Sequence, residues 1–352
     1  MRHVIKYLLL ATFCILLAAG TWVGYTAWTF LNTAPETPGK DIYIDIPPGA
    51  TLSRISVTLE EKGAITSSFK FRLLARYKKA STALQAGRFQ LSTGWLPERV
   101  LDTLVNGKPV LTRITIPEGL TLWQTARLLA DRGFAPYDEL MAVLKDSKFL
   151  LHYGIPFATA EGFLMPDTYL LKLPDETAPD PRQAWKVAGR LVDNFWQKAA
   201  SCWPDGKKPE RKELQRLVIL ASIVEKETAV PAERPRVAGV YTNRLKRNML
   251  LQADPCVIYG LGETFRGNLT RSMLNDPKNA YNTYQKAGLP PGPICSFGVS
   301  ALKAAVKPEE HDYLYFVAIT DGGAHKFSKT LREHNIAVQQ YLRNRRKAQS
   351  GQ

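Results

Sequence analysis

One carboxylate in this 352-residue sequence stands where an apolar side chain is expected. In a helix running from Leu214 to Thr228, Leu214, Val218 and Ala221 fall within about 40° of Glu225, so Glu225 continues their apolar stripe. Burial disfavours the ionised form and raises the pKa of a carboxyl group, which can then serve as a general acid near neutral pH. Two other interpretations are a terminal residue emerging into solvent and a buried glutamate paired with a basic residue.

A second acid follows two residues later, but it points elsewhere. Glu227 lies about 160° from Glu225 around the same helix, so the two carboxylates cannot form a catalytic pair there. Any chemistry at this helix must therefore use a single acid/base. Serine nucleophile elbows, P-loops and Gly-x-Gly-x-x-Gly fingerprints are absent from the sequence.

Polar and aromatic residues are dense downstream of this helix. They form the segments Asn243-Arg244, Gln252-Ala253-Asp254-Pro255, Ala280-Tyr281-Asn282-Thr283-Tyr284 and Gly322-Gly323-Ala324-His325-Lys326-Phe327. Amides and hydroxyls bind sugar hydroxyls, and rings stack on the apolar face of a sugar, although each segment alone is also ordinary turn chemistry. The candidate substrate-binding residues in these segments are Gln252, Asp254, Asn282, Tyr284 and His325, and Glu161, upstream of the helix, is a further candidate.

An internal repeat precedes these residues. The segment from Ile44 to Gly63 aligns at an offset of 70 with the segment from Ile114 to Gly133. Each copy reads as a short alternating strand, a Pro/Gly turn and a helix, with Thr51 or Thr121 as the N-cap. The copies are interpreted either as spacers or as glycan-binding units.

The N-terminus carries a membrane signal. Residues 7–31 contain no charged side chain, and a helix of that length crosses the roughly 30 Å hydrocarbon core of a bilayer. Arg2 and Lys6 precede this run, which places the N-terminus in the cytoplasm. A cleaved signal peptide, with a cleavage region at residues 17–20, and a buried core helix are the alternatives. The length of the run favours an uncleaved anchor.

The net charge of +15 therefore belongs mostly to an exported domain. With 47 Lys and Arg against 32 Asp and Glu, the part after the anchor keeps +13. That location favours a cell-wall polymer or anionic lipid as the partner and disfavours nucleic acid. Three exported cysteines, Cys202, Cys256 and Cys295, allow at most one disulfide. No metal and no cofactor are predicted, because neither the cysteines nor the five histidines have metal-ligand spacing.

The predicted fold class is α+β. The predicted parts are a cytoplasmic tail (1–6), a transmembrane anchor (7–31), a linker (32–40), a repeat region of small α+β units (41–139), a mainly helical catalytic domain (140–342) and a basic C-terminal tail (343–352). A single strand is expected near residues 313–319 of the catalytic domain.

Several motifs together resemble one known family. The run Ala221-Ser222-Ile223-Val224-Glu225-Lys226-Glu227-Thr228-Ala229 resembles the central motif of the endolytic murein transglycosylases, the YceG-like family. Similar family motifs occur, in the same order, at residues 161–169, 252–255, 258–260, 280–284, 288–293 and 313–317. The sequence departs from the family at Ala253, where Thr is frequent, and at Leu164-Met165, which replaces a more aromatic pair.

The resemblance implies a single-pass inner-membrane enzyme with LysM-like units and a periplasmic catalytic domain. Enzymes of this family are lytic transglycosylases, carbon–oxygen lyases that cleave nascent peptidoglycan strands between N-acetylmuramic acid and N-acetylglucosamine. They leave a 1,6-anhydro end and terminate strand elongation. The catalytic glutamate of the family falls on Glu225, and peptidoglycan synthases are candidate partners. A hydrolase of the same bond and a non-catalytic, membrane-tethered peptidoglycan-binding scaffold are the alternatives.

Overall fold

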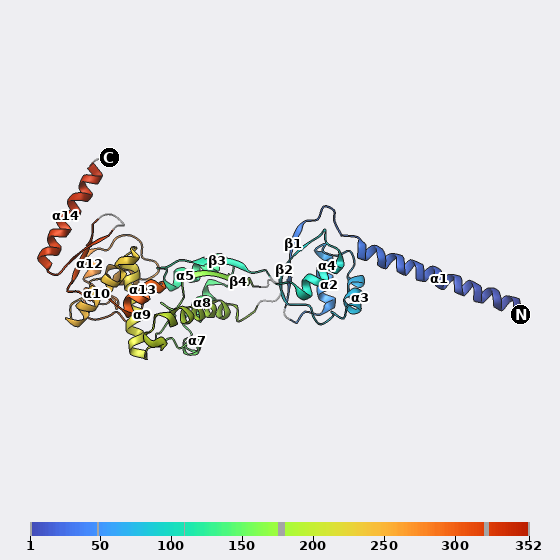
Figure 1. Ribbon diagram of the computed structural model, residues 1–352, viewed down its shortest axis with the longest axis horizontal. Coiled ribbons are helices and arrows are strands. Elements are labelled where there is room, and N and C mark those ends of the chain that lie inside the picture. Colours follow the sequence, from blue (N-terminus) through green and yellow to red (C-terminus); the bar gives the residue numbers. More distant parts are fainter. Residues whose placement is uncertain (1, 48, 109, 175–179, 320–323, 351–352) are drawn as a thin grey trace. The chain divides into compact units, whose positions relative to one another are not determined.

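The computed structural model describes residues 2–47, 49–108, 110–174, 180–319 and 324–350 (Figure 1). The chain divides into two compact units. Unit 1 comprises Met1–Thr112 and Leu170–Pro181, and unit 2 comprises Arg113–Tyr169 and Arg182–Gln352. Helices dominate, and three two-stranded sheets lie among the described residues. The α+β class predicted from the sequence is therefore confirmed.

Unit 1 contains the first repeat copy and the elements that complete it. Its elements are α1 (Arg2–Asn32), β1 (Asp41–Ile46), α2 (Leu52–Glu61), α3 (Ser68–Tyr77), β2 (Gly87–Ser92) and α4 (Pro97–Asn106). Strands β1 and β2 pair antiparallel, with Asp41 opposite Ser92 and Ile46 opposite Gly87. Alternate residues such as Ile44 and Phe89 are buried against the helices, which gives the unit one apolar core.

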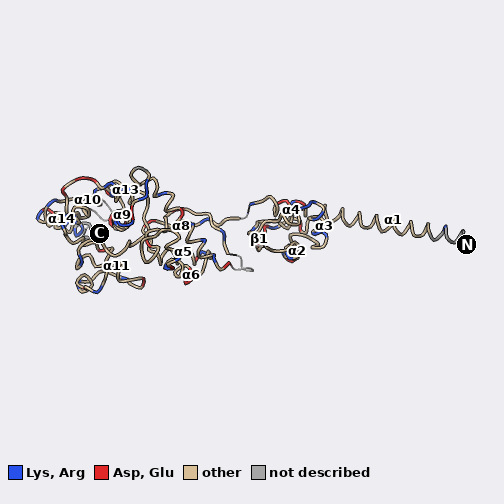
Figure 2. Tube along the Cα trace, turned by 90° about the horizontal axis from the view of Figure 1, so that it is seen from below, with Lys and Arg blue, Asp and Glu red and all other residues tan. Residues whose placement is uncertain are grey.

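Helix α1 is long and apolar enough to cross a membrane. The qualifying stretch runs from Leu9 to Asn32 with a mean hydropathy of 1.6, and a signal sequence would pass the same test. Figure 2 shows no charge along α1 after its first residues. Its far end is fixed to unit 1, because Phe30 is buried in that core.

The segment after α1, predicted as a linker, is held to unit 1 by hydrogen bonds. The Thr93 hydroxyl donates to the Glu36 carboxylate at 2.8 Å and accepts from the Lys40 amide at 2.8 Å. The Glu36 amide also donates to the Thr93 carbonyl at 3.1 Å. Irregular backbone is thus fixed by contacts with one threonine.

The second repeat copy opens unit 2. The copy forms β3 (Thr112–Ile116) and α5 (Leu122–Asp131). It is followed by α6 (Tyr137–Val143), α7 (Ser147–His152) and β4 (Asp167–Leu171), and β3 pairs with β4. Both predicted N-caps are confirmed: the hydroxyl of Thr51 accepts from Arg54 N, and that of Thr121 accepts from Gln124 N. Gly63 and Gly133 follow the helices with φ of 72° and 76°, a conformation that glycine adopts without strain.

The compact units do not follow the predicted boundary between residues 139 and 140. The second copy belongs with the helices of the predicted catalytic domain, because α5 packs on α6 and its preceding turn is bonded to a distant loop. In that turn the Gly119 amide donates to the Ser296 carbonyl at 2.8 Å, and the Ser296 amide donates to the Leu120 carbonyl at 2.7 Å.

The rest of unit 2 is mainly helical. Its helices are α8 (Gln183–Ala199), α9 (Arg211–Glu227), α10 (Arg234–Lys246), α11 (Asp254–Gly260), α12 (Arg271–Leu274), α13 (Val299–Val306) and α14 (Leu331–Ser350), with 3-10 turns at Ala200–Cys202, Pro204–Gly206 and Pro231–Glu233. Helix α9 packs on α10, α11 and α13.

One prediction at the C-terminal end needs correction. The strand expected near residues 313–319 is β5 (Tyr315–Ala318), but it pairs with a second strand, β6 (His325–Ser328), that the sequence analysis did not predict. Helix α14 continues through most of the predicted basic tail to Ser350, and residues 351–352 lie outside the described part.

Candidate active site

Helix α9 places Glu225 in its last turn. The apolar stripe is buried as its spacing predicts, since Leu214, Val218 and Ala221 are all 2% exposed or less. The Glu225 side chain is only 5% exposed. A carboxyl group thus ends a buried stripe on a helix enclosed by its neighbours.

Two groups hold the Glu225 carboxyl. Arg234, at the start of α10, donates through Nη2 to Oε1 at 2.7 Å, and the backbone amide of Gly298 donates to Oε2 at 3.0 Å. Arg234 is itself buried, with a side chain 7% exposed. The Gly298 amide comes from the N-cap of α13. Both carboxyl oxygens are therefore fixed by groups from other elements.

A second carboxylate, Glu118, adjoins this pair. Its Oε2 accepts from the same Arg234 Nη2 at 3.3 Å, so an oxygen of Glu118 and one of Glu225 lie within about 6 Å of each other. Glu118 belongs to the turn between β3 and α5, and its side chain is 48% exposed. A Cβ on Gly298 would lie 1.8 Å from Glu118 Oε1, so a larger residue there would displace the Glu118 carboxylate.

The surroundings of Glu225 raise its pKa above the usual value of a carboxyl group. Burial is the largest influence and raises the pKa of Glu225. The Gly298 amide and the Arg234 guanidinium lower that pKa, and the neighbouring Glu118 raises it. The net direction is upward. A carboxyl group with this balance can donate a proton and then act as a base.

Glu227 has a different environment, in agreement with its predicted direction around α9. The Tyr241 hydroxyl donates to Glu227 Oε1 at 2.8 Å. Burial raises the pKa of Glu227 to about 7. Its charged neighbours are Asp254 and Arg244, so it belongs to a second polar group.

This second group contains three of the predicted substrate-binding residues. The Tyr284 hydroxyl donates to Asp254 Oδ1 at 2.6 Å, and the backbone amide of Gln252 donates to the backbone carbonyl of Thr283 at 3.1 Å. Gln252 and Asp254 are exposed. The structure thus brings Gln252, Asp254 and Tyr284 together, but none of them contacts Glu225 through a described hydrogen bond.

Of the other three predicted residues, Asn282 contacts this group, because its Oδ1 accepts from the Tyr284 backbone amide at 3.0 Å. Asn282 is fully buried, and its amide donates to the carbonyls of Met273, Leu274 and Asp276 at 2.8 to 3.2 Å, which fixes a loop. His325 Nδ1 lies 2.7 Å from Glu233 Oε2, beside Arg234 in the sequence. Gly322 and Gly323 of its motif lie outside the described residues.

Glu161 is a buried residue that fixes the start of α5. Its Oε2 accepts from the Leu122 amide at 2.8 Å, and its Oε1 accepts from the Gly162 amide at 3.3 Å. Burial raises the pKa of Glu161 to about 7. With an exposure of 1%, Glu161 is placed to support the repeat helix rather than to contact a ligand directly.

Sequence reasoning missed Glu118, Arg234 and Gly298. The repeat offered one signal for Glu118, because the second copy has this acid where the first copy has Pro48. Pro48 lies outside the described residues. Arg234 had no signal beyond its charge. Gly298 follows a rigid loop and was not distinguishable from a turn glycine.

Two hollows in unit 2 adjoin these segments. A groove of about 900 Å³ is lined by Pro235, Val299 and Ser300, which follow Arg234 and Gly298 in the chain, and by Trp203. A smaller hollow of about 320 Å³ is lined by the segment from Ala280 to Pro291. Within the described part of the chain, no group of three or more His, Cys, Asp or Glu side chains is arranged to hold a metal ion. All four cysteines are free.

Known proteins are similar to this chain in sequence. The chain is 32% identical over 330 residues to a Bacillus subtilis (strain 168) protein named endolytic murein transglycosylase, and the match covers 89% of this chain and 88% of that relative. A protein of the same name from Streptococcus pneumoniae (strain R6) is 28% identical, over 95% of this chain and 64% of the relative, so the chain spans less than two thirds of that protein.

A solved structure and a family profile agree with these relatives. The crystal structure of a YceG-like protein from Listeria monocytogenes matches with 32% identity and a TM-score of 0.54, covering 84% of this chain and 98% of that one. The profile of the YceG-like family matches residues 44–340. These matches confirm the resemblance seen in the motifs, and the chain belongs to the YceG-like family.

Proposed function

We propose that this protein is an endolytic murein transglycosylase whose acid/base is Glu225. Family membership and the names of the relatives support the class of enzyme. The observation that carries the assignment within this chain is the buried Glu225 carboxyl, held on both oxygens, with a raised pKa. Its substrate is a nascent peptidoglycan strand.

The mechanism uses one carboxyl group twice. Protonated Glu225 gives its proton to the oxygen that links N-acetylmuramic acid to N-acetylglucosamine, and the bond from that oxygen to muramic acid C1 breaks. C1 becomes oxocarbenium-like. The ionised Glu225 then removes the proton from the 6-hydroxyl of the same sugar, whose oxygen bonds to C1 and closes a 1,6-anhydro ring. No water enters, so the reaction does not need the second carboxylate of the usual glycosidases.

Arg234 and Glu118 have opposite effects on the pKa of Glu225. Arg234 stabilises the carboxylate that forms after the first proton transfer, because its guanidinium lies 2.7 Å from Glu225 Oε1. Glu118 opposes ionisation of Glu225 and so keeps the proton available at the start. Glu118 thereby favours the protonated form that acts as the acid, and Arg234 favours the ionised form that acts as the base.

The proposed location follows from α1. Its apolar stretch favours a single-pass inner-membrane protein. Arg2 and Lys6 precede that stretch, which favours a cytoplasmic N-terminus and therefore a periplasmic catalytic domain. The β-α-α-β order of unit 1 fits a LysM-like unit that meets glycan near the membrane. Peptidoglycan synthases, which make the nascent strand, are the expected partners.

The test replaces Glu225 by glutamine. Glu225→Gln keeps the shape but removes the transferable proton, so cleavage is expected to fall by about 10²- to 10⁴-fold. Glu213→Gln, on the exposed side of the same helix, is the matched control. Mass spectrometry of digested nascent glycan measures anhydro-muramic ends. If Glu225→Gln releases such ends as fast as the wild type, the assignment is wrong.

Glu118 is the observation that favours a second candidate, a hydrolase of the same bond. A carboxylate near the acid could activate water, as in two-carboxylate glycosidases. That enzyme would leave reducing-end muramic acid and incorporate ¹⁸O from labelled water, whereas the transglycosylase product contains no solvent oxygen. The remaining candidate, a non-catalytic scaffold, predicts that the wild-type protein binds glycan without cleaving it.

A further inference from the structure

Helix α3 exposes a row of large apolar side chains. Phe69, Leu73 and Tyr77 are spaced four residues apart and therefore share one face of the helix. They are 60%, 48% and 83% exposed. The opposite face, with Phe71 and Ala75, is buried in the core of unit 1. A row of this size on a surface indicates contact with other apolar material.

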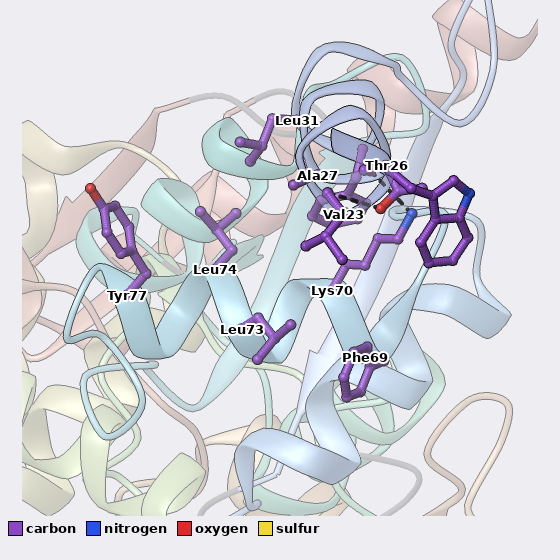
Figure 3. Close-up of a pocket in the computed structure, with 11 residues that line it drawn as sticks. Val23, Thr26, Ala27, Leu31, Phe69, Lys70, Leu73, Leu74 and Tyr77 are labelled. Carbon is purple, nitrogen blue, oxygen red and sulfur yellow. Dashed lines mark hydrogen bonds between the residues drawn. The ribbon is translucent and has the colours of Figure 1, made fainter. Parts of the chain in front are cut away.

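This row borders the end of α1. Between the two helices lies an apolar groove of about 560 Å³, to which α1 contributes Trp22, Val23 and Ala27 and α3 contributes the apolar row (Figure 3). Both helices belong to unit 1. The exposed apolar surface of α1 thus continues along this groove onto α3, and Thr26 and Lys70 are the polar residues in the lining.

Lys70 sets the level of α3 along α1. Its Nζ donates to the Thr26 carbonyl at 3.2 Å. A helix that enters the hydrocarbon at Leu9 reaches Thr26 after about 25 Å, close to the far edge of a core roughly 30 Å thick. An ammonium group is stable at that edge, where it reaches headgroups, and not at the bilayer centre.

Cations outnumber acids around the row, where Glu60 is hydrogen-bonded to Ser68 and Glu98 is paired with Lys78. No Asp or Glu occurs between Lys62 and Pro97, while Arg72, Arg76 and Lys79 lie on or next to α3. An exposed apolar row flanked by cations is the composition of a helix that lies in the plane of an anionic membrane surface.

We infer that α3 is a second membrane contact: its Phe69, Leu73 and Tyr77 row enters the interfacial lipid beside the exit of α1, and its cations bind anionic headgroups. This inference rests on the proposed anchor role of α1. It would hold unit 1 against the bilayer surface instead of leaving it on a free tether.

The experiment uses the full-length protein in nanodiscs of phosphatidylethanolamine and phosphatidylglycerol. In a Cys14→Ala background, whose other three cysteines are buried, a bimane label is attached at Leu73→Cys or Tyr77→Cys. Ala18→Cys reports on α1, and Tyr43→Cys, on the sheet face opposite the helices, is the matched exposed control. Quenching by lipids carrying a doxyl group near the headgroup is compared with quenching by aqueous iodide.

Labels at positions 73 and 77 should be quenched severalfold more by the doxyl lipid, and severalfold less by iodide, than the label at position 43. Iodide quenching equal to that at position 43 overturns the inference. So does protection from both quenchers, which would mean that protein covers the row. If the Ala18→Cys label is quenched by lipid while those at 73 and 77 are not, the anchor stands and the α3 contact fails.

Discussion

The two repeat copies share a local structure and differ in what surrounds it. In both, the paired isoleucines of the strand are buried, the turn glycine has a positive φ (78° at Gly49, 80° at Gly119), and a threonine caps the helix. A Cβ on Gly49 would meet open space, whereas one on Gly119 would lie 3.8 Å from Lys226, next to Glu225. The turn of the second copy is therefore part of the candidate site.

The difference rests on few residues. The positions that the copies share are those that a strand, a turn and a capped helix require. Positions 48 and 118 are not shared, and the second copy has there the carboxylate that contacts Arg234. A structural repeat can thus become part of a catalytic site through its turn, while its core residues stay the same.

The largest expected effect comes from removing the residue that joins the second copy to Glu225. Arg234→Gln leaves a buried carboxyl without its cation, which should cost about 3 kcal/mol of unfolding free energy. Because Arg234 lowers the pKa of Glu225, its loss should raise that pKa. Glu225 must be protonated to act as an acid, so the alkaline limb of the pH–rate profile should move to higher pH.

Thermal unfolding and the pH dependence of kcat/KM, both in detergent, measure these effects. Arg236→Gln is the control, because Arg236 lies on the same helix and its ion pair with Glu309 is partly exposed. An alkaline limb that moves to lower pH in Arg234→Gln would contradict the proposed electrostatics.

Glu118→Gln should act in the opposite direction and more weakly. Removing the negative neighbour lowers the pKa of Glu225, so the alkaline limb of kcat/KM should move to lower pH. The fold should hardly be affected, since the Glu118 side chain is half exposed. Glu61→Gln, an exposed acid of the first copy, should leave the profile unchanged. Equal shifts in the two variants would remove the distinction between the copies.

The sequence predicted the features that depend on local spacing. The stripe that buries Glu225 and both threonine caps follow from periodicities within about 15 residues. Strand β6 was missed because Phe327 is the one apolar residue among His325–Ser328, whereas β5 is apolar throughout. The unit boundary was missed because it depends on which strand pairs with β3.

The surroundings of Glu225 were not predictable in the same way. Glu118 and Arg234 are 116 residues apart in the chain and meet only through the packing of α9, α10 and the repeat turn. Of the polar residues downstream, Gln252, Asp254 and Tyr284 lie together in the structure. Asn282 has a side-chain amide of the kind that can bind a sugar, but this amide already donates to three loop carbonyls.

The smallest effect separates the copies most directly. Thr51→Ala and Thr121→Ala each remove one capping hydrogen bond, so each should lower the unfolding free energy by about 1 kcal/mol. Only Thr121→Ala should also slow cleavage, because its helix begins directly after the turn that carries Glu118, and Glu161 holds the first amide of that helix. Turnover measured at a temperature where both variants are fully folded tests this. If both alanine variants slow cleavage equally, the second copy acts on the site only through overall stability, and its turn has no special role.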